Sequence, residues 1–155
     1  MKKAVKIIVL VLAAGFLVIQ LFQIDKSNPP INEGETIEAA VSVPPEISSI
    51  LSRSCNDCHS NNTVYPWYSY IQPVGWFLKN HIDKGRDELN FSRFAAYEPK
   101  RRNKKFKEVC EQVGSGEMPM TAYVIGHPNA ALTEADKKAL CDWANSLRRD
   151  EGSDH

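Results

Sequence analysis

Apolar and polar residues are unevenly distributed along the chain, and the pattern begins with an apolar run behind a basic start. Residues 1–24 combine three lysines with an uninterrupted apolar run from Ile7 to Ile19. This pattern is typical of a signal peptide or a signal-anchor helix. No A-x-A cleavage site follows the run, so we expect an uncleaved transmembrane helix. The lysines would stay inside, and the rest of the chain would face the periplasm or extracytoplasmic space.

The remaining pattern predicts a tether and then a helical domain. Residues 25–44 are rich in turn formers and have no regular apolar spacing, which predicts a flexible tether. From residue 45 on, apolar residues recur at helical spacing, and no stretch alternates as a strand would. The expected helices cover residues 46–54, 73–85, 104–113 and 133–147. We therefore expect an all-α domain over residues 45–149, followed by a polar tail at 150–155.

Length and charge limit the possible functions. The 155 residues suggest one domain with accessory segments. Lysine plus arginine and aspartate plus glutamate both number 19, so the net charge is zero and nothing favours nucleic-acid binding. Short helices with long connections bury only a modest apolar core. A large, flat, apolar cofactor would supply the missing core.

The strongest chemical signal is a C-x-x-C-H motif, in which Cys55, Cys58 and His59 occupy the fixed positions. This motif is typical of c-type haem attachment. The two thiols reach the two vinyl groups of the porphyrin, and the histidine lies below the iron as proximal ligand. A thioredoxin-like site would need a βαβ pattern, and a zinc site a second ligand pair. The other cysteines, Cys110 and Cys141, are isolated, so the motif predicts one covalent haem c.

A second iron ligand is expected from the glycine-rich segment 114–120. Met118 lies there, followed by a proline that stiffens the loop. A methionine thioether binds haem iron and raises its reduction potential. We therefore predict Met118 as the distal ligand. Met120, His81, His127 and an open sixth position are the alternatives.

Several segments carry a family resemblance in their order and spacing. They are Ser54–Asn61, Tyr65–Tyr68, Pro73–Trp76, His81 with Gly85-Arg86, Leu89–Ser92, Gly116–Pro119, Tyr123 with His127-Pro128, and Trp143. Over residues 30–147 the chain resembles the bacterial haem-binding domain family of monohaem, cytochrome c-like proteins. The resemblance implies a cytochrome c-like helical fold on an N-terminal anchor. The pair Cys110 and Cys141 departs from the family's pattern.

Four further residues are candidates for haem contacts. Trp67 and Trp76 belong to an aromatic block that would line the haem, or else supply ordinary core and surface aromatics. His81 and Arg86 could pair with the haem propionates, or else be solvated surface residues.

Three further interactions are expected between distant parts of the chain. The carbonyl of Pro66 or Pro73 would accept a hydrogen bond from His59 and orient its ring. Cys110 and Cys141 would form a disulfide in an oxidising compartment, or else remain buried thiols. The basic run at residues 100–107 would be a solvated helix face, or else dock an acidic redox partner.

These observations favour a monohaem c-type cytochrome that transfers electrons at the outer face of the cytoplasmic membrane. An iron with six ligands has no open position for a substrate, so we expect an electron carrier with a redox partner protein and no enzymatic activity. The alternative is a peroxidase-like enzyme or gas sensor with a displaceable sixth ligand. A structural subunit of a respiratory complex is the third possibility.

Overall fold

The computed structural model describes residues 2–148, and every regular element in that range is helical. The elements are α1 (Lys2–Ile19), η1 (Glu33–Glu35), α2 (Ile37–Ala40), α3 (Pro45–Ser54), α4 (Asn56–His59), η2 (Trp67–Tyr70), α5 (Val74–Glu88), η3 (Phe91–Ala96), α6 (Pro99–Ser115), α7 (Thr121–Gly126), η4 (Pro128–Ala130) and α8 (Glu134–Ser146). The prediction of an all-α protein is confirmed. The polar tail predicted at 150–155 lies outside the described residues.

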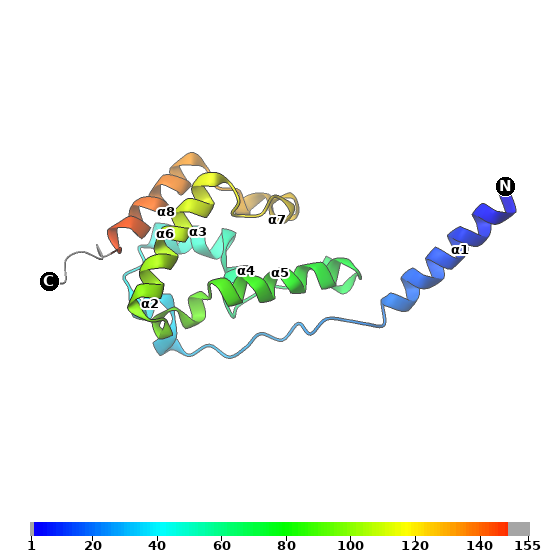
Figure 1. The fold of residues 1–155 in the computed structure, drawn as a ribbon, viewed down its shortest axis with the longest axis horizontal. Helices are drawn as coiled ribbons and strands as arrows, with labels where there is room; N and C mark the ends of the chain where they lie inside the picture. The colour runs from blue at the N-terminus through cyan, green and yellow to red at the C-terminus, as the bar shows by residue number, and fades with distance from the viewer. Residues whose placement is uncertain (1, 149–155) are drawn as a thin grey trace.

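Helix α1 projects away from the remaining helices, and an extended segment joins it to them (Figure 1). Its 18 residues include no buried side chain. Within residues 2–148, no helix has both the length and the apolar character needed to cross a membrane. The transmembrane helix expected from the sequence is therefore not supported. After its three lysines, the apolar part of α1 is roughly 20 Å long, whereas a bilayer core is about 30 Å thick.

Residues 25–44 lie against the domain instead of forming a separate tether. The side chain of Asn28 donates a hydrogen bond to the carbonyl of Thr63 at 2.9 Å. Ile37, in α2, is only 2% exposed and belongs to the main core cluster. The predicted domain boundary at residue 45 therefore falls inside the packed structure. This packing could not be predicted from the sequence, because a single buried isoleucine produces no periodic pattern.

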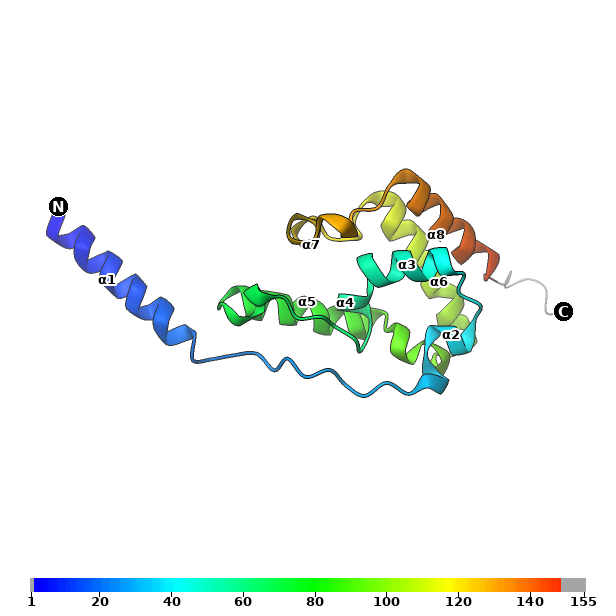
Figure 2. The same cartoon turned by 180° about the vertical axis from the view of Figure 1, so that it is seen from behind.

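The main core lies where α3, α6 and α8 meet. Helices α6 and α8 lie side by side (Figures 1 and 2), and the rings of Phe106 and Trp143 meet edge to face at 5.6 Å. A disulfide between Cys110 and Cys141 joins the two helices, as predicted. Helix α8 starts with a capping box, in which the Thr133 side chain accepts from the Asp136 backbone N–H and the Asp136 side chain accepts from the Thr133 backbone N–H. These contacts make a rigid wall on one side of the molecule.

Helices α4 and α5 form the opposite side and pack closely against each other. The close packing requires a glycine at position 85. A Cβ atom added there would lie 2.6 Å from the carbonyl oxygen of Cys58. Helix α4 carries the end of the C-x-x-C-H motif, so this contact fixes the motif against α5. Figure 2 shows the α4–α5 layer across from α3, α6 and α8.

Candidate functional site

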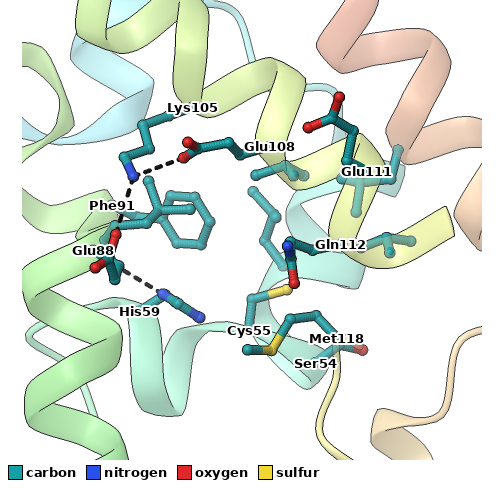
Figure 3. A pocket seen from close by; sticks show the side chains of 15 residues that line it. Ser54, Cys55, His59, Glu88, Phe91, Lys105, Glu108, Glu111, Gln112 and Met118 are labelled. Atoms are coloured by element: carbon teal, nitrogen blue, oxygen red, sulfur yellow. Dashed lines mark hydrogen bonds and ion pairs between the residues drawn. The ribbon is translucent and has the colours of Figure 1, made fainter. Parts of the chain in front are cut away.

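A pocket of about 490 Å³ lies between α3 and α4, the end of α5, and α6 (Figure 3). Its volume falls within the range of about 300–1,000 Å³ that is usual for small-molecule and cofactor sites. Its lining residues are Leu51, Ser54, Cys55, His59, Glu88, Leu89, Phe91, Lys105, Glu108, Val109, Glu111, Gln112, Val113, Met118 and Leu140. Most of this surface is apolar, and the polar groups come mainly from α6.

His59 presents one ring nitrogen to the pocket. Its Nδ1 lies 3.0 Å from the carbonyl oxygens of both Gly85 and Leu89. Because both neighbours are acceptors, Nδ1 carries the proton, and Nε2 is left as a lone-pair donor facing the cavity (Figure 3). Burial lowers the pKa of His59, which favours the neutral imidazole that binds metals. The prediction that Pro66 or Pro73 supplies the accepting carbonyl is wrong, because the end of α5 lies closer.

Cys55 and Cys58 both carry free thiols. Cys55 lines the pocket together with His59, whereas Cys58 does not line it. The sulfur of Cys55 faces the pocket (Figure 3). Burial raises the pKa of Cys55 to about 12. Burial, together with the charge of Asp57, raises the pKa of Cys58 to about 11. Both side chains are therefore neutral thiols near pH 7.

Met118 enters the pocket across from His59 (Figure 3). Its loop begins at Gly116, whose positive φ of 79° ends α6 in the left-handed conformation that glycine adopts readily. The backbone N–H of Met118 then donates to the carbonyl of Gln112 at 3.1 Å, which folds the loop back onto α6. Met120 does not line the pocket. The structure thus separates two methionines that the sequence left as alternatives.

The other predicted haem contacts lie outside the pocket. Trp67 and Trp76 are 75% and 40% exposed, respectively. The ring of His81 contacts that of Phe77 in a tilted arrangement, with the ring centroids 4.1 Å apart. His81 and His127 do not line the pocket either. The aromatic block therefore does not form a wall of this cavity.

Arg86 stabilises the chain just beyond the motif. Its guanidinium donates to the carbonyl of Ser60 at 2.8 Å. It also bonds the side chains of Asn28 and Thr63, at 2.8 and 2.9 Å. Its donors therefore hold together three segments, and Arg86 does not line the pocket.

Lys105 was missed as a site residue because it lies within the basic run. It is only 8% exposed and lines the pocket. Its Nζ lies 2.7 Å from a carboxylate oxygen of Glu108 and 3.4 Å from one of Glu88. One signal was present in the sequence: Val109 and Val113 follow at i+4 and i+8, which places Lys105 on the apolar face of its helix.

A second missed contact links the motif to the methionine loop. Tyr123, on α7 just after that loop, donates its hydroxyl proton to Asp57 at 2.7 Å. Asp57 also accepts from the backbone N–H of Val64 at 2.9 Å. Burial, together with this hydrogen bond, raises the pKa of Tyr123. Tyr123 also stacks on His127 at the end of its own helix, with centroids 4.2 Å apart. The hydrogen bond from Tyr123 to Asp57 therefore links α7 to α4.

The donors around the pocket fit a haem better than a bare metal ion. One imidazole nitrogen and one thioether lie on opposite walls, and a porphyrin supplies the four remaining ligands of an octahedral iron. Cys55 and Cys58 precede His59 in the sequence at the spacing that covalent attachment requires, and Cys55 lines the pocket. Apolar side chains from several elements would cover the ring faces.

Comparison with known proteins gives one clear result. No curated protein and no solved structure matches the chain. The family model of the haem-binding domain matches residues 14–146, a range that contains the motif and every residue of the pocket. The chain therefore belongs to the haem-binding domain family.

Proposed function

We propose that this protein is a monohaem c-type cytochrome that carries electrons at the outer face of the cytoplasmic membrane. Membership of a haem-binding family supports haem as the ligand. The orientation of His59 carries the finer proposal. Two backbone carbonyls hold its Nδ1, and its Nε2 is directed at a cavity that Met118 enters from the other side.

Covalent attachment is proposed for Cys55 and Cys58. Each thiol would add across one vinyl group, with sulfur bonding one carbon and the thiol hydrogen ending on the other. No oxidant or reductant is consumed in that addition. The raised pKa values keep both groups in the thiol form. The Gly85 contact holds the backbone of Cys58 close to α5, the helix whose end also orients His59.

We propose His59 and Met118 as the two protein ligands of the iron. A haem held by both residues would have no open position for a substrate and would supply one-electron transfer between the ferrous and ferric states. The apolar lining residues would pack against the ring, and Lys105 would offer a cation to a propionate. The porphyrin carries its propionates on the edge opposite its vinyl groups. Lys105 lies on the pocket wall away from Cys55 (Figure 3).

The location and the partner are also part of the proposal. The exposed apolar surface of α1 supports attachment to a membrane. A redox partner protein would approach the haem domain from the aqueous side. The basic run on α6 is less available for this than the sequence suggests, because Lys105 is buried and Lys104 and Lys107 pair with glutamates on their own helix.

An absorption spectrum of protein matured with a c-type haem attachment system tests the proposal. We expect a low-spin spectrum in both oxidation states, and in the oxidised state the weak long-wavelength band of an iron–methionine bond. Met118→Ala should abolish that band, whereas the control Met120→Ala should retain it. A high-spin spectrum that shifts with carbon monoxide in the unmodified protein would refute six-coordination and favour the enzyme or sensor alternative.

A further inference from the structure

A group of large apolar side chains lies exposed at the end of the domain nearest α1. They come from η2, the connection after it, and the first turn of α5. This aromatic surface consists of Trp67, Tyr70, Ile71, Val74, Trp76 and Phe77. Isolated exposed apolar residues are normal, but a contiguous group of this kind usually marks an interaction site. The haem pocket does not use any of these residues.

Hydrogen bonds connect the aromatic surface to the end of α1. The Gln20 side chain donates to the carbonyl of Gln72 at 3.0 Å and accepts from its backbone N–H at 2.8 Å. The indole N–H of Trp76 donates to the carbonyl of Phe22 at 2.9 Å. Figure 1 shows the start of α5 beside the end of α1. The exposed apolar surface therefore continues from α1 through Leu21 and Phe22 onto the domain.

The chemistry of the surface fits the interfacial layer of a bilayer. Tryptophan and tyrosine are enriched at the level of lipid head groups, because each has an apolar ring and a polar atom. The ammonium of Lys26 lies 4.1 Å from the centre of the Tyr70 ring, at the border of the surface. A cation in this place favours anionic head groups. A protein partner would have to cover both this surface and the adjoining α1.

We propose that the aromatic surface docks into the head-group region of an anionic membrane, beside α1. This inference goes beyond the proposed electron transfer and does not require a haem. Docking of the aromatic surface would also set how far the pocket lies from the membrane. Helix α5 begins at the aromatic surface and ends at the pocket, and its 15 residues span roughly 20 Å. The pocket is therefore held away from the membrane, where a soluble partner can approach it.

Fluorine NMR of the full-length, reduced haem protein tests the docking. All tryptophans are replaced by 5-fluorotryptophan, and the protein is placed in vesicles of phosphatidylglycerol and phosphatidylcholine. A fraction of the lipids carries a spin label on the head group. The signals of Trp67 and Trp76 are assigned from phenylalanine variants. They should be broader on the labelled vesicles than on the same vesicles without the spin label. The signal of Trp143, which is 8% exposed in the core, should stay sharp.

A variant pair shows whether the surface itself is responsible. Trp67→Ser combined with Phe77→Ser should reduce the broadening of Trp76 and leave the haem spectrum unchanged. Ile125→Ser removes an equally exposed apolar residue on α7, and should leave the broadening unchanged. Equal broadening of all three tryptophans, or none at Trp67 and Trp76 while the protein stays on the vesicles, would overturn the proposal. If the Trp67 and Trp76 signals broaden only when the spin label is carried by a second copy of the chain, and not when the lipids carry it, the result would overturn the proposal in favour of self-association.

Discussion

Replacing Gly85 with alanine tests how the structure positions the C-x-x-C-H motif. The added Cβ would lie 2.6 Å from the carbonyl oxygen of Cys58, and 3.2 Å from both its carbonyl carbon and its Cβ. Ordinary contact begins at 3.4 Å, so α4 and α5 must separate by about 3.4 − 2.6 = 0.8 Å. The obstructing atom belongs to the backbone, so no side-chain rotation relieves the contact.

The cost follows from this displacement. Forcing an extra methyl group into a packed site typically costs about 1–3 kcal/mol. The same separation stretches the bond from His59 to the Gly85 carbonyl, at 3.0 Å in the structure, and losing it costs about 0.5–1.5 kcal/mol. Alanine regains up to about 1 kcal/mol through its higher helix propensity. We therefore expect a net loss of about 1–3 kcal/mol in the free energy of unfolding.

Urea unfolding of the haem protein, followed by far-ultraviolet circular dichroism and haem absorbance, measures this loss. Gly114→Ala is the matched control, because Gly114 also lies in a helix and a Cβ there meets nothing within 4 Å. The control should be neutral or slightly stabilised. If Gly85→Ala unfolds at the same urea concentration as Gly114→Ala, with an unchanged haem spectrum, the argument that this contact positions the motif is refuted.

Three further changes test other parts of the structure. Tyr123→Phe removes the hydrogen bond to the motif's aspartate, a loss of about 1.5–3 kcal/mol in unfolding free energy, and should weaken the iron–methionine band. Lys105→Met removes a buried cation from the pocket wall, so it should lower the reduction potential of the haem protein. Lys104→Met, at an exposed position, should leave the potential nearly unchanged. Replacing Cys110 and Cys141 with serine opens a loop with a sequence separation of 31 residues and should lower the unfolding free energy by about 3–4 kcal/mol.

Each of these expectations has a result that contradicts it. A Tyr123→Phe protein with full band intensity would show that α7 does not position Met118. Equal potentials for the two lysine variants would show that Lys105 does not act on the haem. Two free thiols, found by mass spectrometry under non-reducing conditions, would contradict the disulfide.

The sequence by itself determined the spacing of the C-x-x-C-H motif and most of the helices. Cys55, Cys58 and His59 lie within five consecutive residues, so their relation is set by local chain geometry. The helices were predictable for the same reason, because a periodic apolar pattern reports one face of one element. Thr133 and its capping box belong to this class, since the bonds join residues three apart.

Only the tertiary structure decided which distant groups meet. The carbonyls that orient His59 come from the end of α5, 26 and 30 residues further along the chain, and no local pattern indicates them. The same holds for the finding that Met118 lines the pocket and Met120 does not, which depends on how the loop after α6 turns back. Lys105 is buried although Lys104 and Lys107 of the same basic run are exposed, because burial depends on which helix covers it. All of these contacts join segments that are distant in the sequence. They stabilise the protein only when the whole chain has folded, so no local pattern reports them.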